Sequence, residues 1–437
     1  MTAAEASPIP SPARTRAVLL ALLGVTLLKI LWAFNSAGSV DAVLFFNFAR
    51  GIEEHGLTPL YGMDEKFNHT PLTGGFAVFL YRAAGGDPAA HAQNHAPRSD
   101  SDIQERQKVL LRFALLLRLA SIAADIAVVA GLLRWRALLG NRPVWWALIL
   151  FAASPVSLMV SGFHGNVDPI MVAALFFATV AAAGGRPALC GMLFGLAANV
   201  KIVPIVLAPV FFFFWLARPG AWRFVISSGA VMLAGWSLPL LVCPRDFLHN
   251  VFGYGSTWGV WGVTHLLRIT GWEEVQKIDF KGLTPAQNTI AAVLKFAAIG
   301  GIATVGWLRR KAAPVEFAAS IGMAWLVFFI CAPGVGVQYM VWAAPFLLLL
   351  TARGYAVITA AATVFLFVFY HSTSQGRWPW FFALPRGPEA PLWSAWGSLA
   401  WLSFLGVFLT LVWRRRQALA ESRCTFVAET ELGAAQI

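Results

Sequence analysis

Long apolar runs alternate with short polar segments along most of the chain, and this pattern is typical of helices that cross a lipid bilayer. A membrane-spanning helix needs about 20 apolar residues, and the first run occupies residues 17–34. Further runs occupy residues 109–133, 144–162, 169–183, 188–200, 202–217, 222–242, 289–308, 314–332, 337–352, 355–371 and 394–413. The pattern predicts an all-α fold, a polytopic membrane helical bundle of about 11–13 membrane helices.

Composition supports the same fold class and limits the kinds of partner. The chain has 437 residues, of which 58% are hydrophobic and 12% charged, whereas a soluble domain carries about 25% charged residues. The net charge of +12 comes from Lys and Arg that lie mostly in short loops. This is the distribution of cytoplasmic loops in membrane proteins, so we expect the lipid bilayer as a partner and no nucleic acid. The four scattered cysteines form no CxxC or Cys–His pair that would predict a zinc or redox centre.

The positive charges also predict which side of the membrane each loop faces. Arg14 and Arg16 place the chain's beginning in the cytoplasm, so the segment after the first span lies outside. The apolar stretch Pro71–Ala84 is only about 14 residues long, which is short for a span. If it does not cross, the basic loop 134–142 is cytoplasmic, and His164 and Gln338 lie on the same outer side as Asp41. We therefore prefer the interpretation in which Pro71–Ala84 does not cross.

This topology predicts one membrane domain with two short tails. The expected organisation is a cytoplasmic N-terminal tail 1–16, a transmembrane domain 17–416 with external loops 36–108, 244–288 and 372–393, and a cytoplasmic, disordered tail 417–437. The expected location is the bacterial inner (plasma) membrane, with a site that faces the periplasm or exterior.

The segment Ser39–Pro71 is too polar to lie in lipid and too aromatic to be a free linker. Within it, residues 43, 44, 45, 48 and 52 are apolar, which predicts an external amphipathic helix over Asp41–Glu54 at the membrane surface. Asp41 is either a helix cap or a reactive acid held by an ordered segment. Asn68 and His69 follow in the cluster Phe67–Pro71, and they add polar side chains to the same outer face.

Polar residues at the ends of later spans are candidates to meet Asp41. His164, Asn166 and Asp168 lie in one turn between two spans, where Asp168 is also a good N-cap. Lys201 interrupts an apolar run; a lysine at membrane depth is a functional hypothesis by default, with snorkelling to the interface as the alternative. Gln338 and Tyr339 open another span, where aromatic residues also serve as interface anchors.

The span 109–133 carries charges of its own. Arg118 and Asp125 are seven residues apart, so they share a helix face and are candidates to neutralise each other inside the bundle. Elsewhere the chain has no Walker A, strand-linked GxGxxG, HExxH or GxSxG motif. No ATP-driven step or nucleotide-sugar domain is therefore predicted, and an activated, lipid-soluble donor fits that absence.

Five motifs in order resemble those of the GT-C class of integral-membrane glycosyltransferases over roughly residues 17–350. The likeness is closest to the first mannosyltransferase of GPI assembly and its bacterial relatives, and looser to the dolichyl-phosphate-glucose glucosyltransferases. The motifs are the acid after the first span, FNHTPL, SPVSLMVSGFHGNVDPIMVA, GLAANVKIVPIVLAPV and GVQYMVWAAPF.

The resemblance implies an inverting transfer of a hexose, with mannose favoured, from a polyprenyl-phosphate-linked sugar donor to a lipid, glycan or protein acceptor. Asp41 corresponds to the family's catalytic acid, which acts as general base. The donor phosphate is expected at Lys201 with help from His164. The substrate is expected to contact Asn68, His69, Asn166, Asp168, Gln338 and Tyr339.

Metal binding and the class of activity each have alternatives. Relatives often carry a second acid two residues from the first, but Ser39 and Val43 occupy those places here, so no metal ligand is assigned and no cofactor is predicted, with a divalent metal as the alternative. The intramembrane charges of Lys201, Arg118 and Asp125 also allow a polyprenyl-lipid transporter or flippase. A non-catalytic membrane subunit of a glycan assembly complex is the third interpretation.

Overall fold

The computed structural model describes residues 12–87, 100–140, 144–253, 258–276, 282–374, 378 and 391–434. All regular elements within these ranges are helices, and no strand occurs in them. The all-α prediction is confirmed.

In the described part of the chain, eight helices or continuous runs of helices are long and apolar enough to span a membrane. They are α1 (Pro12–Phe34), α5 (Asp100–Arg134), the run of α6 (Trp145–Ala152), α7 (Pro155–Met159) and η1 (Val160–His164), α11 (Ala221–Val242), α15 (Pro285–Arg309), η3 (Pro314–Glu316) with α16 (Phe317–Cys331), α18 (Ala352–Thr373) and α19 (Pro391–Ala434).

Four further apolar helices are shorter than a full span. They are α8 (Asp168–Ala183), α9 (Pro187–Val200), η2 (Val203–Leu207) with α10 (Ala208–Leu216), and η4 (Val337–Val341) with α17 (Ala344–Leu350). The long and short helices together agree with the prediction of a polytopic helical membrane protein. Some of their ends coincide with candidate residues: α8 begins at Asp168, Lys201 directly follows α9, and Gln338 lies in the first turn of η4.

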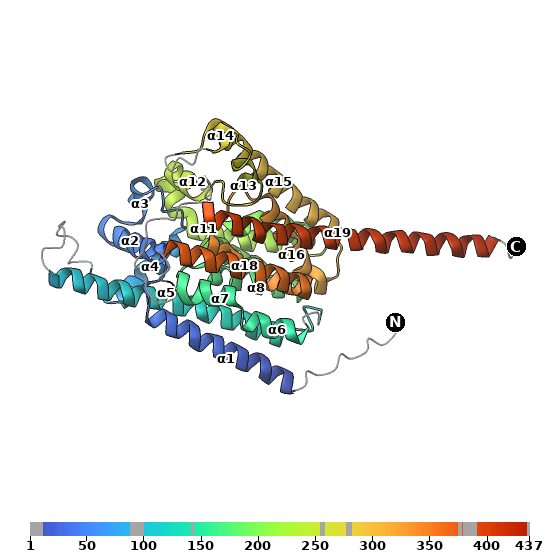
Figure 1. Cartoon of the computed structure of the whole chain (residues 1–437), viewed down its shortest axis with the longest axis horizontal. Helices are drawn as coiled ribbons and strands as arrows, with labels where there is room; N and C mark the ends of the chain where they lie inside the picture. The colour runs from blue at the N-terminus through green and yellow to red at the C-terminus, as the bar shows by residue number, and fades with distance from the viewer. Residues whose placement is uncertain are drawn as a thin grey trace.

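Small helices gather at one end of the bundle. They are α2 (Val40–His55), α3 (Leu57–Met63), α4 (Pro71–Ala83) and α12 (Pro244–Phe252), and Figure 1 shows them at the end away from the start of α1 and the end of α19. The two helices α1 and α5 run in opposite directions, and α4 packs against α2 at the end where α1 finishes and α5 begins. This arrangement is the one expected if residues 71–84 do not cross the membrane.

The remaining predicted loops differ in how much structure they contain. The loop 244–288 includes α12, α13 (Gly262–Arg268) and α14 (Glu273–Gln276); α12 packs against α11 and α3, and α14 packs against α13 and α15. Most of the loop 372–393 lies outside the described residues. The backbone of α19 continues as a helix as far as Ala434, through most of the predicted tail 417–437.

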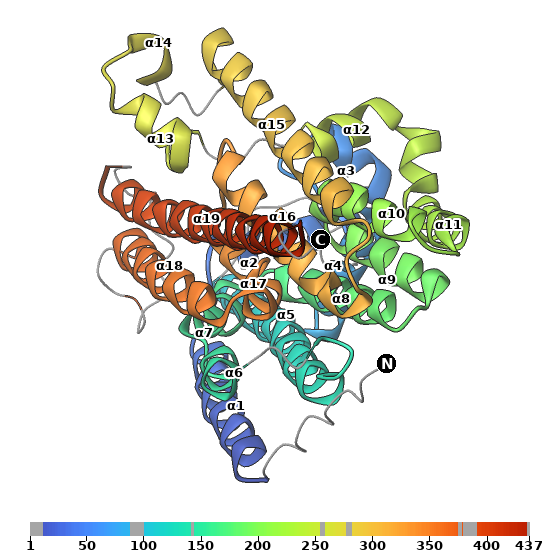
Figure 2. The same ribbon diagram turned by 90° about the vertical axis from the view of Figure 1, so that its right-hand side faces the viewer.

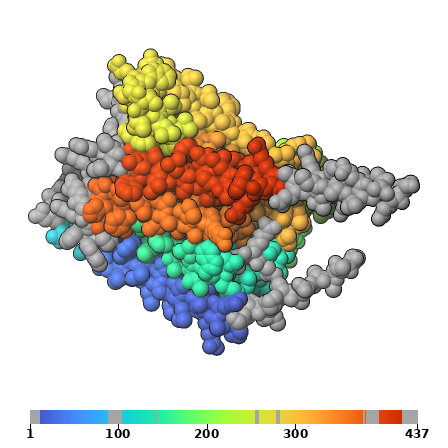
Figure 3. All heavy atoms as spheres, turned by 45° about the vertical axis from the view of Figure 1, so that its right-hand side comes forward, coloured from blue at the N-terminus to red at the C-terminus, as the bar shows by residue number. Residues whose placement is uncertain are grey.

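The bundle is closed by contacts between helices that are distant in sequence. Seen end-on in Figure 2, α8 and α17 lie inside the bundle, while α1, α11 and α15 lie on its outside. The two last helices, α18 and α19, pack side by side across one face of the molecule (Figure 3). Residues of α8, α16 and α17 make up much of the buried core.

Lys29, in the last third of α1, forms an ion pair inside the bundle that was not predicted from the sequence. Its side chain is only 2% exposed, and its Nζ lies 2.7 Å from Asp125 Oδ2. Nζ also donates to Ser157 Oγ at 2.6 Å, and that hydroxyl donates to the same carboxylate oxygen at 2.6 Å. Three polar groups thereby join α1, α5 and α7, and Asp125 has Lys29 rather than Arg118 as its partner.

Arg118 instead holds the end of α1. It is fully buried, and its guanidinium donates to the carbonyl of Ala33 at 3.1 Å, to the hydroxyl of Ser36 at 3.0 Å and to the Ser36 carbonyl. Its Nε donates to Ala114 O within α5 at 2.8 Å. The last carbonyls of a helix have no partner inside the helix, so Arg118 supplies the hydrogen bonds that α1 lacks. Its position therefore fixes the turn from α1 to α2.

The pair formed by Lys29 and Asp125 predicts how stability responds to substitution. Lys29→Met leaves the partly buried Asp125 carboxylate without its cation, and removal of one partner of a fully buried pair costs about 3–5 kcal/mol, so we expect a cost of about 1–3 kcal/mol here. We expect a clearly lower melting temperature in detergent. The double variant Lys29→Met/Asp125→Leu removes both charges and should recover most of the loss.

Lys108→Met is the matched control, because Lys108 pairs with Glu105 on an exposed surface. Exposed pairs contribute about 0–1 kcal/mol, so this variant should melt close to the wild type. An equal loss of stability in Lys29→Met and Lys108→Met would contradict a structural role for the buried pair.

Candidate active site

Asp41 lies in the first turn of α2, but it does not cap the helix. Ser39 is the N-cap, and its hydroxyl accepts a hydrogen bond from Asp41 N at 3.1 Å. The inward face of α2 consists of apolar residues, Ala42, Phe45, Phe46, Phe48 and Ala49, which are all buried. The predicted amphipathic helix is therefore present, and its cap leaves the Asp41 carboxylate free for other contacts.

The start of α2 is attached directly to the turn that carries His164. The backbone N–H and the hydroxyl of Ser39 both donate to the carbonyl of His164, at 3.1 and 2.8 Å. Gly38 precedes this junction with a φ of +83°, and a Cβ there would lie 2.8 Å from the carbonyl oxygen of Phe163. Only glycine combines that backbone conformation with so close an approach.

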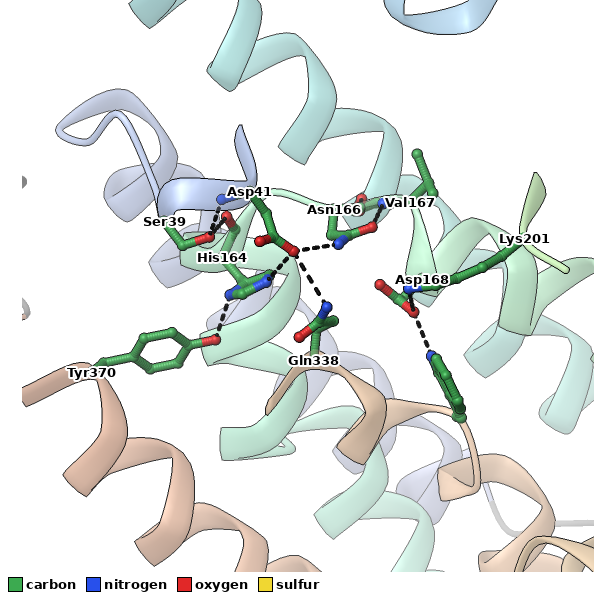
Figure 4. A network of polar contacts seen from close by, with 11 residues as sticks. Ser39, Asp41, His164, Asn166, Val167, Asp168, Lys201, Gln338 and Tyr370 are labelled. Atoms are coloured by element: carbon green, nitrogen blue, oxygen red, sulfur yellow. Dashed lines mark hydrogen bonds and ion pairs between the residues drawn. The ribbon is translucent and has the colours of Figure 1, made fainter. Parts of the chain in front are cut away.

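The Asp41 carboxylate is held by one of its two oxygens. Oδ2 lies 2.9 Å from His164 Nε2, accepts from Asn166 Nδ2 at 2.6 Å, and accepts from Gln338 Nε2 at 3.3 Å (Figure 4). The other oxygen, Oδ1, has no hydrogen-bond partner among the described residues, and the side chain is 27% exposed. Three donors thus fix the carboxylate while one oxygen stays open to a ligand.

The second ring nitrogen of His164 contacts a residue that the sequence analysis missed. Nδ1 of His164 lies 2.9 Å from the Tyr370 hydroxyl, which comes from the last turns of α18 (Figure 4). Because a carboxylate only accepts, Nε2 carries the proton that it shares with Asp41. Both ring nitrogens of His164 then bind protein groups, Nε2 the Asp41 carboxylate and Nδ1 the Tyr370 hydroxyl. From the sequence, Tyr370 could be noticed only as a hydroxyl-bearing residue near the end of the predicted span 355–371.

Asp41 is ionised in this environment. Burial by itself raises the pKa of a carboxyl group, but the charge and hydrogen bond of His164, the charge of Lys201 and the hydrogen bond from Asn166 outweigh it and lower the pKa of Asp41 to about 2. The group is therefore a carboxylate at any physiological pH. It can accept a proton only while that proton is leaving a reacting group.

Lys201 and Asp168 form a second buried pair next to Asp41. Lys201 Nζ lies 2.8 Å from Asp168 Oδ1, and the indole N–H of Trp342 donates to the same oxygen. The N-cap of α8 is Val167, which makes no side-chain cap hydrogen bond, so the prediction that Asp168 caps the helix is wrong. The carboxylate is used to bind the lysine, which explains how a lysine is retained at this depth.

Two stacked rings support the ammonium group from the other side. Tyr339 and Trp342 stack with centroids 3.7 Å apart, and Lys201 Nζ lies 4.9 and 5.2 Å from the two centroids. Such distances allow cation–π attraction. Lys201 is therefore a fixed part of the wall and does not snorkel to the interface.

A cavity of about 490 Å³ opens in front of Asp41. It is lined by Asp41, Leu44, Phe45, Phe48, Glu65, Lys66, Asn68, His69, Asn166, Lys201, Ile202, Val203, Val251, Gln338 and Tyr339. Seven of the residues predicted from sequence line it together. The other two, His164 and Asp168, are buried behind the wall and contact Asp41 and Lys201 respectively.

His69 presents a neutral ring to this cavity. It packs against Phe45 with the ring centroids 4.6 Å apart. Burial, together with the positive charge of Lys201, lowers the pKa of His69 to about 3 despite the opposing charge of Asp41. A neutral imidazole offers one donor and one acceptor, which suits hydroxyl groups better than phosphate.

The donor set of the cavity resembles a sugar site more than a metal site. Within the described ranges, no three His, Cys, Asp or Glu side chains gather closely enough to hold a metal ion. The partners of Asp41 Oδ2 are amide and imidazole N–H groups, which compete with a cation for that oxygen. Carboxylate, amide, imidazole and aromatic side chains around one cavity can bind polyhydroxylated ligands.

Comparison with known proteins adds a family match. The sequence model of glycosyltransferase family 87 matches residues 109–333, which is more than half of the chain. No curated protein matches the chain significantly. The matched region contains His164, Asn166, Asp168 and Lys201, whereas Asp41, Gln338 and Tyr370 lie outside it. The expectation of a membrane glycosyltransferase is confirmed, while the closer likeness to the GPI mannosyltransferase stays a prediction.

The junction between Gly38 and the His164 turn leads to a stability prediction. Gly38→Ala places a Cβ against the Phe163 carbonyl at a positive φ, and such backbone strain costs about 1–3 kcal/mol. We expect a lower melting temperature in detergent. Gly24→Ala is the matched control, since a Cβ there meets nothing within 4 Å. Equal melting temperatures for the two variants would contradict the close packing of this junction.

Proposed function

The chain belongs to glycosyltransferase family 87, and from this premise we propose that it transfers a hexose, with mannose favoured, from a polyprenyl-phosphate donor to an acceptor at the outer face of the membrane. Asp41 is the general base in this proposal. The acceptor is a lipid, glycan or protein that brings one hydroxyl group into the cavity.

The observation that carries the proposal is the asymmetric binding of the Asp41 carboxylate. Oδ2 has three donors, and Oδ1 has none among the residues described. A general base must be fixed and still have a lone pair within hydrogen-bond reach of the proton that it accepts. Asp41 meets both requirements at the wall of a cavity of about 490 Å³.

The proposed reaction is a single displacement. The acceptor oxygen attacks the anomeric carbon while Oδ1 of Asp41 takes the hydroxyl proton. The bond between that carbon and the phosphate oxygen breaks, and its electron pair remains on the polyprenyl phosphate. Attack from the side opposite the leaving group inverts the anomeric configuration. The proton ends on Asp41, and it returns to solvent before the next turnover.

The positive potential of Lys201 supports the departure of the phosphate. Its Nζ faces the cavity, but it is also 2.8 Å from Asp168. It therefore acts as a fixed, partly neutralised cation near the developing charge. His164 is a positioning residue in this scheme, because it holds Asp41 while Tyr370 holds its second nitrogen.

Asp41→Asn tests the base directly. An amide cannot accept the proton, and general-base catalysis contributes about 10²- to 10⁴-fold to rate. We expect kcat for sugar transfer from a polyprenyl-phosphate donor to fall by that factor in the purified protein. The melting temperature should change little, since the amide keeps the shape of the side chain.

Asp246→Asn is a suitable control, because Asp246 lies exposed on α12 at the same end of the molecule. Its activity should equal that of the wild type. Full transfer activity in Asp41→Asn would exclude Asp41 as the base.

The low pKa of Asp41 predicts the shape of the pH profile. The carboxylate loses its proton near pH 2, so kcat/KM should show no acid limb from Asp41 between about pH 4 and 7. Asn166→Ala removes one hydrogen bond to the charged form, and a bond of that kind corresponds to about one pH unit. The acid limb of the variant should therefore lie about one pH unit above that of the wild type, near pH 3 rather than near pH 2. The measurement is kcat/KM against pH for both proteins down to about pH 3, and equal activity of the two proteins at that pH, relative to pH 7, would contradict this account.

A further inference from the structure

A second cavity of about 410 Å³ lies directly beside the first. The two share Ile202, Val203, Val251 and Tyr339 in their walls. The first cavity is lined by both polar and apolar residues, whereas the lining of the second is apolar apart from Lys295 and the aromatic residues Tyr339 and Trp342. Tyr339 thus lies between a chamber with polar side chains and an apolar one, and both are large enough to hold part of a ligand.

Lys295 is the only charged residue among the described residues that line the apolar cavity. It belongs to the membrane-spanning helix α15, ten residues after Pro285. It lies on the inward stripe of that helix, four residues after the buried Ala291 and three before the buried Ala298. Its side chain is nevertheless exposed, and it lines the open cavity.

No ion-pair or hydrogen-bond partner of Lys295 is found within the described part of the chain. A charged side chain within a membrane span is costly and is retained for function or with a partner. The other two lysines inside the bundle, Lys29 and Lys201, each have a carboxylate within 2.8 Å. Because the cavity residues around Lys295 are apolar, we expect the partner of its ammonium group to be an anionic group on a bound ligand.

The apolar cavity is accessible from the lipid side of α15. Val293, Phe296 and Ile299 on this helix are 61%, 74% and 48% exposed, which is the expected state of side chains that face lipid tails. Ile299 also lines the cavity. A hydrocarbon chain can therefore pass from the bilayer into the cavity without crossing a polar surface.

The charged groups around the first cavity leave no net positive charge there. Lys201 is compensated by Asp168 at 2.8 Å, Lys66 and Glu65 add one charge of each sign to the same wall, and Asp41 adds a negative charge. A polyprenyl-phosphate sugar is a phosphodiester with one negative charge, so binding it next to these groups calls for another positive charge. Lys295 supplies that charge, and the apolar walls next to it suit an isoprenoid tail.

We propose that Lys295 binds the phosphate of the lipid donor and that the apolar cavity holds the first isoprene units of its tail. The sugar then extends past Tyr339 into the cavity in front of Asp41. This inference rests on the proposed function, and it names the residue and the chamber that select a phosphate-bearing isoprenoid.

The test is binding of a polyprenyl monophosphate without sugar to the purified full-length protein in detergent. This probe needs no catalysis. Loss of a charge-assisted contact should weaken its Kd roughly 10- to 100-fold in Lys295→Gln, and Lys295→Arg should stay within a few-fold of the wild type. A polyprenol of the same length, which lacks the phosphate, should bind wild type and Lys295→Gln with equal affinity.

Lys311→Gln is the control for this experiment. It removes a charge at an exposed position beyond the end of α15, and it should leave the Kd unchanged.

The outcomes separate the two proposals. If the wild type transfers sugar from the lipid donor and Lys295→Gln binds the monophosphate as tightly as the wild type does, the role of Lys295 is overturned and the proposed function stands. If the wild type transfers no sugar from any polyprenyl-phosphate donor, the proposed function fails, and this inference fails with it.

Discussion

The position of Asp41 depends on hydrogen bonds to a few buried carbonyl groups. Arg118 donates to the last carbonyls of α1, and Ser39 donates twice to the carbonyl of His164. A buried carbonyl without a partner is unfavourable, so each of these groups restricts where the chain can turn. The carboxylate and its three donors are consequently brought together by main-chain contacts that lie outside the cavity itself.

The charges in the bundle fall into two kinds. Lys29 with Asp125 and Lys201 with Asp168 are direct ion pairs, in which each charge compensates the other. Asp41 is held mainly by two amide N–H groups and an imidazole N–H. These donors occupy only Oδ2, and none of them is a lysine or arginine paired with the carboxylate. The Oδ1 of Asp41 therefore stays open to a ligand, whereas the other two carboxylates each bind a lysine.

The sequence was sufficient to predict the fold class and seven of the residues that line the candidate cavity, because both follow from patterns visible in short stretches. Apolar runs give the helices, and the side of each loop follows from the Arg and Lys positions, which brings Asp41, Asn166 and Gln338 to one face. It was harder to predict from the sequence which residue a given side chain contacts. Asp168 reads locally as a cap, whereas its real partners, Lys201 and Trp342, come from other helices. Lys29 and Tyr370 were missed for the same reason, since each acts through a contact with a distant element.

The ion pair inside the bundle has a consequence for biosynthesis. Lys29 and Asp125 are 96 residues apart, and at the usual rate of protein synthesis about 5 to 20 s pass between their emergence. During that interval α1 carries an ammonium group with no carboxylate to meet it, and its four-carbon stem lets that group stay near water at the membrane surface. The ammonium can move into the bundle only when α5 arrives, so the first helix reaches its final depth late in assembly.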